Sequence, residues 1–367
     1  MIISRTPYRI SFLGGGTDYP GWYLKHGGQV LSTTIDKYIH IFCRYLPPFF
    51  EHRLRLVYSK IETCQHVSEL DHPSAREVLK YMDIDNGLEI HYDGDLPGRS
   101  GLGSSSAFTV GLLNALYAYQ GQKISQHRLT TESIHIEQTI VGEKVGSQDQ
   151  VSAAYGGFNT IRFSTEGQIT VEPVIVNENR IKQLNNMFML FFSGISRTAS
   201  EIADTYVNDL NSRRRQLKRM SKMVDEAAQL VRSNTALGEF GELLHESWIL
   251  KRSLSPVVSN SKVDQAYDTA RRAGALGGKL TGAGGGGMLL LCVPPERREM
   301  VREKLSGLVH IPFCFEQTGS QIIFRDIQQR YQESEQLRRT KLKGGKSILE
   351  ESVTTSHARY VIPDPKS

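Results

Sequence analysis

A glycine- and serine-rich segment, Gly98–Ser106, separates a strand-like stretch from an apolar helix. Leu88–Tyr92 alternates apolar and polar side chains as a half-buried strand does, and apolar residues recur at helical spacing from Ala107. Glycines let the backbone curl with its N–H groups bare, and the first turn of the next helix adds unpaired donors. The pattern predicts an anion-binding loop, whereas a flexible linker is not normally held between two structured elements. No Gly-Lys-Ser/Thr ends the segment, so it is not a Walker A loop.

The length and the composition indicate a globular chain of two packed domains. The 367 residues exceed the usual size of one small domain, and the hydrophobic share of 39% is that of an ordinary globular protein. Strand-like and helix-like stretches interleave along the chain, which favours the α+β class. We expect an N-terminal domain over residues 1–184, a second domain over residues 185–328, and a polar, basic tail over residues 329–367.

The charge and the cysteines limit the partners and the compartment that we expect. Of the formal net charge of +5, a net of three lies in Arg330–Ser367, which holds eight basic and five acidic residues. The body is therefore near neutral and a poor nucleic-acid binder. No apolar stretch approaches the roughly 20 residues of a membrane span, and no leader pattern opens the chain. The four scattered cysteines predict neither zinc nor disulfides and fit a reducing cytoplasm. The sequence leaves a homo-oligomer open.

A second glycine-rich segment, Gly282–Gly287, matches the G-x-G-x-x-G spacing of dinucleotide-binding loops. That fingerprint opens a helix, whereas these glycines lead into the strand-like Met288–Val293 and then two prolines. An oxidoreductase is therefore disfavoured. We expect instead a turn that allows close backbone approach, either to protein or to a ligand between the domains. Gly14–Asp18 presents the same choice near the N-terminus.

Three charged residues stand out from their surroundings. Glu137 borders an apolar helical stripe that includes Ile136 and Ile140, so its carboxylate requires a metal ion or an ion-pair partner. Asp149 follows a glycine and by itself fits a helix cap or a turn. Arg9 is a cation inside a strand-like run, and alone it indicates little.

Three segments, taken together, resemble the motifs of a known enzyme family. Thr6–Asp18, Leu96–Ala107 and Lys279–Gly287 occur in the order of the three motifs of the GHMP kinases, which include galactokinase, homoserine kinase and mevalonate kinase. The resemblance covers the chain up to the tail. It implies an N-terminal α/β domain like ribosomal protein S5 and a ferredoxin-like α+β C-terminal domain. ATP and a small-molecule acceptor would bind between them.

The same resemblance implies roles for individual residues. Asp149 would be the acceptor-side base and Arg9 would lie near the transferred phosphate. Ser105, in preference to Ser104, would bind Mg²⁺ together with Glu137. The loop that would wrap the ATP phosphates consists of Pro97, Gly98, Arg99, Ser100, Gly101, Leu102, Gly103, Ser104, Ser105 and Ser106. The acceptor side would be formed by Thr17, Asp18, Gly282, Gly284 and Gly285.

Further segments resemble one branch of this family. Galactokinases carry Gly-Glu-His-Thr-Asp-Tyr where this chain has Gly14-Gly-Gly-Thr-Asp-Tyr, which argues against galactose. Gly146–Gln150, Ser193–Ser200 and Arg271–Lys279 look like segments of bacterial kinases of D-glycero-D-manno-heptose 7-phosphate, which phosphorylate the anomeric hydroxyl for surface polysaccharide synthesis. An acceptor phosphate would require cations, for which the candidates are Arg197, Lys251 and Lys279. A galactose- or fucose-type kinase and a non-catalytic sensor of the same fold stay as alternatives.

Overall fold

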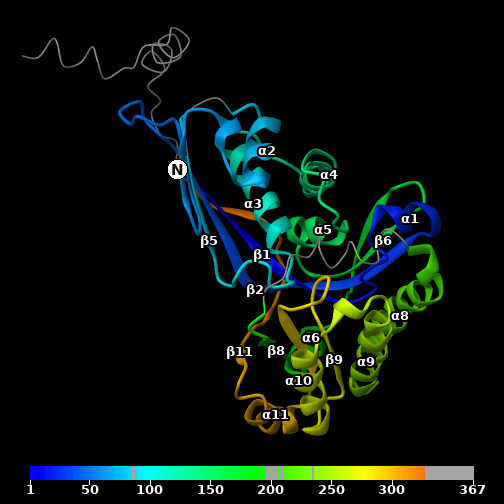
Figure 1. Cartoon of the computed structure of the whole chain (residues 1–367). Coiled ribbons are helices and arrows are strands. Elements are labelled where there is room, and N and C mark those ends of the chain that lie inside the picture. The colour runs from blue at the N-terminus through cyan, green and yellow to red at the C-terminus, as the bar shows by residue number, and fades with distance from the viewer. Residues whose placement is uncertain (85–86, 196–204, 206–209, 234, 327–367) are drawn as a thin grey trace, which may run out of the picture.

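The computed structural model describes residues 1–84, 87–195, 205, 210–233 and 235–326. Two sheets organise this part of the chain, one mixed and one antiparallel, and helices pack against both (Figure 1). This is the two-domain α+β arrangement that the interleaved sequence pattern and the motif resemblance predict. No helix in the described ranges combines the length and the apolar character needed to cross a bilayer.

The larger sheet is built on two long strands, β1 (Ile2–Leu13) and β2 (Gly28–Tyr45), which pair antiparallel. Its main path runs β13-β1-β2-β5-β3-β4, and the β3–β5 pairing is parallel, which makes the sheet mixed. The other strands are β3 (Leu54–Val57), β4 (Ile61–Cys64), β5 (Leu88–Gly94), β6 (Phe158–Phe163), β7 (Ile169–Pro173), β12 (Phe315–Glu316) and β13 (Gln321–Arg325).

The last described strands return to this first sheet. β12 pairs with β2, and β13 pairs with β1, so strands from both ends of the described chain lie side by side. The segment over residues 185–328 thus supplies the second sheet and also two strands of the first.

Helix α3 (Ser104–Tyr119) lies directly on β1 and β2 and is buried on most of its surface. The contact is closest at Gly111, where a Cβ atom would lie 2.7 Å from Thr6 Oγ1, and the Ser4 hydroxyl donates to the Gly111 carbonyl over 2.8 Å. Figure 1 shows α2, α3, α4 and α5 gathered on this face of the sheet. The bounds are α1 (Pro20–His26), α2 (Pro73–Tyr81), α4 (Gln126–His135), a π-helix (Ile136–Ile140) and α5 (Gln148–Tyr155).

The second sheet is antiparallel, with the order β11-β8-β10-β9. Its strands are β8 (Phe188–Phe192), β9 (Gly277–Leu280), β10 (Met288–Cys292) and β11 (Val309–Ile311). The helices are α6 (Glu178–Asn186), α8 (Arg214–Arg232), α9 (Gly238–Arg252), α10 (Ser261–Arg272) and α11 (Arg298–Lys304). Short 3₁₀ turns span Val67–Glu69, Leu210–Arg213, Pro256–Val258 and Pro295–Arg297.

Helix α8 connects the two halves because its apolar face is shared between them. Met220, Met223 and Val224 are buried at helical spacing, as the sequence pattern predicts, and α8 packs on both α9 and β2. On its polar side, Asp225 accepts a hydrogen bond from Gln29 Nε2 (2.7 Å), which fixes the helix to β2.

Phe12 is the aromatic centre of the junction between the sheets. Its side chain is fully buried near the end of β1. Its ring centroid lies 4.9 to 6.1 Å from the rings of four partners on β6, β8, α9 and β12, namely Phe158, Phe188, Phe240 and Phe315. Since these partners come from both halves, Phe12 positions the end of β1, and the glycine turn after it, against the second domain.

Replacing Phe12 by alanine should lower the free energy of unfolding by about 3–5 kcal/mol, because the cavity would open where both halves meet. Urea titration followed by circular dichroism measures this. Ile175→Ala is the control, since Ile175 is 84% exposed and its loss should change stability by less than about 0.5 kcal/mol. Equal midpoints for the two variants would show that Phe12 does not join the domains.

Candidate active site

The loop before α3 has the backbone of an anion-binding loop. Arg99, Gly101 and Gly103 alternate along it with φ values of 58°, 80° and 76°, a left-handed conformation that turns neighbouring N–H groups toward a common side. Gly103 is the N-cap of α3 and no side chain caps that end, so the N–H donors of the first turn are open to a ligand. Ser104 Oγ accepts from the Arg99 N–H over 3.2 Å.

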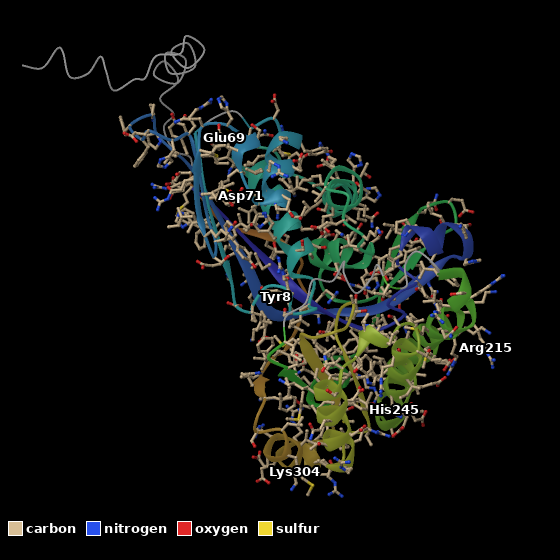
Figure 2. All side chains as sticks on the ribbon, in the orientation of Figure 1. Tyr8, Glu69, Asp71, Arg215, His245 and Lys304 are labelled. Atoms are coloured by element: carbon tan, nitrogen blue, oxygen red, sulfur yellow. The ribbon has the colours of Figure 1, made fainter. Side chains whose placement is uncertain are left out.

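The loop is exposed at its start and anchored behind. Pro97, Gly98 and Arg99 are exposed, whereas Ser100 and Leu102 are buried. The anchor is Tyr8 on β1, labelled in Figure 2, whose hydroxyl donates to the Leu96 carbonyl over 2.9 Å. Together these contacts fix the loop to the large sheet and leave its outer surface free.

The second glycine-rich loop packs directly on the first. It connects antiparallel strands β9 and β10, which is not the strand-to-helix setting of a dinucleotide fingerprint. A Cβ atom on Gly282 would lie 2.6 Å from Gly101 Cα, and Met288 N–H donates to the Ser100 carbonyl over 3.1 Å. Gly285 instead donates to the Val258 carbonyl over 2.8 Å, and Gly284 packs on the same residue. These glycines permit close approach of backbone to backbone.

Arg9 and Asp149 form a bidentate ion pair against the first glycine-rich loop, residues 97–106, which we call the phosphate loop after its proposed role. Arg9 Nε and Nη2 each donate to a carboxylate oxygen of Asp149 over 2.8 Å, and Nη1 donates to the Gly101 carbonyl over 2.9 Å. A Cβ atom on Gly103 would lie 3.2 Å from Arg9 Cγ and 3.5 Å from Asp149 Cγ, so both side chains line that loop. The Arg9 side chain is 4% exposed and that of Asp149 is 26% exposed, so the carboxylate is the accessible member.

Asp18 lies beside this pair, at the turn after β1. Its carboxylate is buried and accepts from Gly16 N–H over 2.9 Å and from Gln148 Nε2 over 2.8 Å. Burial, with the nearby Asp149 carboxylate second, raises the pKa of Asp18. Thr17 is turned away from this group, since its hydroxyl bonds the Gly14 carbonyl over 2.8 Å and shapes the turn.

Glu137 lies on the π-helix, fully buried. Its Oε2 accepts from Ser106 Oγ over 2.8 Å and from Gln150 Nε2, while its Oε1 has no hydrogen-bond partner among the described residues. Desolvation raises the pKa of Glu137 to about 7. Ser105 is exposed, whereas its neighbour Ser106 donates its hydroxyl to Glu137.

This donor set fits Mg²⁺. The ion prefers oxygen ligands and is commonly bound by one or two carboxylates together with substrate phosphates. Glu137 offers one carboxylate oxygen without a partner, beside a serine hydroxyl and at the open N-terminus of α3. The position is also at a π-helix, a local irregularity that is frequent at functional sites.

The two candidate lysines are buried between the halves of the molecule. Lys251 Nζ donates to the Gly282 carbonyl, and burial, with Arg9 second, lowers its pKa to about 8. Lys279 Nζ donates to the carbonyls of Ser11 (2.9 Å) and Phe12 (3.0 Å), and burial lowers its pKa well below the usual value. Both thus bond backbone carbonyls of the glycine motifs or of β1. Arg197 lies outside the described residues.

Sequence reasoning missed Gln148 and Gln150, which flank Asp149 at the start of α5. Successive helical residues point about 100° apart, so the three side chains reach different groups. Gln148 donates to Asp18, Asp149 pairs with Arg9, and Gln150 donates to Glu137. The available signal was the run of three polar residues at the opening of a helix that continues into Val151 and Ala153.

Comparison with known proteins agrees with this geometry. The family model "GHMP kinases N terminal domain" matches residues 71–157, and the model "GHMP kinases C terminal" matches residues 211–309. These ranges contain the phosphate loop, Glu137 and Asp149 in the first case, and the third motif in the second.

Individual relatives extend the similarity over most of the chain. The D-glycero-α-D-manno-heptose 7-phosphate kinase of Campylobacter jejuni is 27% identical over 313 residues, which cover 81% of this chain and 91% of that protein. The bifunctional fucokinase/GDP-fucose pyrophosphorylase of Arabidopsis thaliana is 26% identical over 76% of this chain and 28% of its own length.

The fold is likewise similar to a solved structure. The crystal structure of a D-glycero-D-manno-heptose 1-phosphate kinase from Bacteroides thetaiotaomicron matches with a TM-score of 0.73 and 22% identity, covering 89% of this chain and all of that one. With both family models matched in chain order, over ranges that include the second and third motifs, the chain belongs to the GHMP kinases, which are ATP-dependent phosphotransferases acting on small molecules.

Proposed function

We propose that this kinase transfers the terminal phosphate of ATP to the anomeric hydroxyl of a sugar phosphate, D-glycero-D-manno-heptose 7-phosphate. The observation that carries the proposal is the Arg9–Asp149 pair, which lies between the phosphate loop on one side and Asp18 on the other. The similarity to a curated heptose 7-phosphate kinase over 81% of the chain supports the choice of sugar.

Asp149 is the proposed base for the acceptor hydroxyl. It is the more accessible member of its ion pair, and Arg9 holds it by two hydrogen bonds, which fixes the orientation of the carboxylate. A base held in one orientation loses little entropy when the acceptor arrives. Arg9 also offsets negative charge that develops as the phosphoryl group moves, since catalysis of this transfer rests on positioning and charge neutralisation.

The phosphate loop is the proposed binding site for the ATP phosphates. Its left-handed residues and the uncapped end of α3 offer backbone N–H donors, and the positive end of the helix dipole favours an anion there. Mg²⁺ at Glu137, with the serine hydroxyls nearby, would neutralise charge on the phosphates. Ser105 remains the residue that the family resemblance assigns to the ion, and its neighbour Ser106 is the one that contacts Glu137.

We propose that the acceptor binds at Asp18, close to Asp149. Its buried carboxylate is held by Gly16 and Gln148 and can accept from a sugar hydroxyl. Lys251 lies near Arg9, Asp18 and Asp149 and adds positive charge to this region. Lys279 is the weaker candidate for an acceptor phosphate because its ammonium already bonds two carbonyls of β1.

A panel of acceptors tests the proposal. Purified enzyme with Mg-ATP would be assayed for ADP release on heptose 7-phosphate, mannose, fucose, galactose and mevalonate. We expect heptose 7-phosphate to give the highest kcat/KM. If heptose 7-phosphate is inert and an unphosphorylated sugar is turned over, that sugar replaces heptose 7-phosphate as the proposed substrate. The similarity to a fucokinase makes fucose the first alternative. No turnover on any acceptor would favour a non-catalytic sensor.

The Asp149→Asn variant tests the proposed base in the same assay. It keeps the size of the side chain and one oxygen for Arg9, so the fold and ATP binding should be preserved at a lower stability, because Arg9 loses one of its two carboxylate acceptors. The kcat should fall by about 10²–10⁴, the usual contribution of a positioned base. A kcat near that of the parent enzyme would show that positioning alone drives the transfer.

The buried Glu137 predicts a pH dependence of stability. Its pKa rises from the ordinary value of 4.5 to about 7 on folding, so between these values the folded form keeps a proton that the unfolded form releases. The free energy of unfolding should therefore fall as pH rises through this window, by on the order of 3 kcal/mol, and then level off. Urea titrations from pH 5 to 8 without metal measure it.

Glu137→Gln is the reference for that titration, because glutamine does not ionise. Asp18 also has a raised pKa and stays present in both proteins, so the difference between the two curves isolates Glu137. Adding Mg-ADP should stabilise the parent protein more at pH 8 than at pH 6, since a metal ion binds the ionised form. Parallel curves for parent and variant would contradict the assignment.

A further inference from the structure

Two buried polar atoms near the first glycine turn have no hydrogen-bond partner in the described structure. They are Ser11 Oγ, on a residue 4% exposed, and Gln148 Oε1, on a residue 8% exposed. A buried polar atom without a partner costs free energy, and native proteins leave few of them unexplained. A ligand that supplies the missing hydrogen bonds is one such explanation.

Gly15 lies between these two side chains. A Cβ atom added there would lie 3.7 Å from Ser11 Oγ and 3.8 Å from Gln148 Nε2, both ordinary contact distances. Gly14 and Gly16 differ, because both have positive φ values, and a Cβ atom on Gly14 would lie 2.0 Å from the Gln29 carbonyl oxygen. The backbone therefore requires glycine at positions 14 and 16, while position 15 has room for a Cβ atom and carries none.

The free space at Gly15 adjoins the acceptor side of the proposed site. The Nε2 atom of Gln148 holds the Asp18 carboxylate, and Gln148 directly precedes Asp149 in α5. Ser11 follows Arg9 by two residues on β1, so the two side chains point to the same face of the strand. A group beside Gly15 would therefore lie next to the residues proposed to bind and activate the acceptor.

We propose that Ser11 Oγ and Gln148 Oε1 bind a hydroxyl group of the acceptor in the space above Gly15. A sugar hydroxyl both donates and accepts; Gln148 Oε1 accepts, and the serine hydroxyl donates or accepts. The pair therefore suits one hydroxyl, or two vicinal ones, of a polyhydroxylated acceptor. This subsite rests on the proposed function, and it makes Ser11, Gly15 and Gln148 specificity-determining positions.

Three substitutions test the subsite. Ser11→Ala removes one hydrogen-bonding group, Gln148→Met removes the other with little change of shape, and Gly15→Ala fills the space between them. Each should raise the KM for heptose 7-phosphate, or for the acceptor that the panel identifies, about tenfold, the effect of one lost neutral hydrogen bond or of a blocked contact. For Ser11→Ala and Gly15→Ala, the kcat and the KM for ATP should change less than about twofold.

Stability separates recognition from a structural role. Ser11→Ala deletes a hydroxyl without a partner, so its melting temperature should equal or exceed that of the parent protein. Gln148→Met also removes the donor to Asp18 and is expected to melt lower, which makes Ser11→Ala the decisive variant. Gly307→Ala is the control for Gly15→Ala, since a Cβ atom there meets nothing within 4 Å.

Acceptors lacking single hydroxyl groups identify the contact. With the acceptor lacking the hydroxyl that binds here, Ser11→Ala and the parent enzyme should have the same KM, since the contact is already absent. If the parent enzyme is active and the Ser11→Ala and Gly15→Ala variants have the same acceptor KM as the parent, the subsite is overturned and the proposed function still stands. An equal rise in the KM for ATP would also overturn it. No activity of the parent on any sugar would overturn both.

Discussion

The buried guanidinium of Arg9 is the interaction on which the site depends. It comes from β1, pairs with Asp149 at the start of α5, and donates to the Gly101 carbonyl in the phosphate loop. A buried cation costs free energy unless its hydrogen-bond donors are satisfied. Here the donors of Arg9 are satisfied by groups on two other segments of the chain, the Asp149 carboxylate and the Gly101 carbonyl. Packing of the phosphate loop and of α5 against β1 therefore also brings the residues of the site together.

Close backbone contact is the second constraint. The third motif packs so tightly on the phosphate loop that side chains at Gly282 or Gly287 would overlap Gly101 or Ser100. Lys279 strengthens this junction by donating to two carbonyls of β1, and Lys251 fixes the third motif by donating to the Gly282 carbonyl. Glycine in these motifs thus allows the two domains to pack closely. The backbone N–H groups at the N-terminus of α3 stay open to a ligand.

Local pattern predicted much of this arrangement. The strand before the phosphate loop, the helix after it, and the strand after Gly287 each carry their own periodicity, and each is confirmed. The motifs that define the site also lie in short continuous segments, so their residue types were visible before the fold was known.

What the sequence did not reveal depends on contacts between distant segments. Pairing of β12 and β13 with the first sheet leaves no trace in the periodicity of residues 315–325. The partners of Gln148, Gln150 and Ser106 follow from the direction in which a helix turns each side chain. Lys279 looks like a ligand-binding cation in the sequence, and only its burial against β1 reveals the carbonyls that it bonds.

The most direct measurement is a crystal structure of the enzyme with Mg²⁺ and a non-hydrolysable ATP analogue. The account predicts phosphate oxygens within hydrogen-bond distance of the backbone N–H groups between Gly101 and Ser105, with the metal ion bound to Glu137 Oε1. Arg9 and Asp149 should then flank the terminal phosphate from the acceptor side. A triphosphate bound away from the N-terminus of α3, or a metal ion out of reach of Glu137, would contradict it.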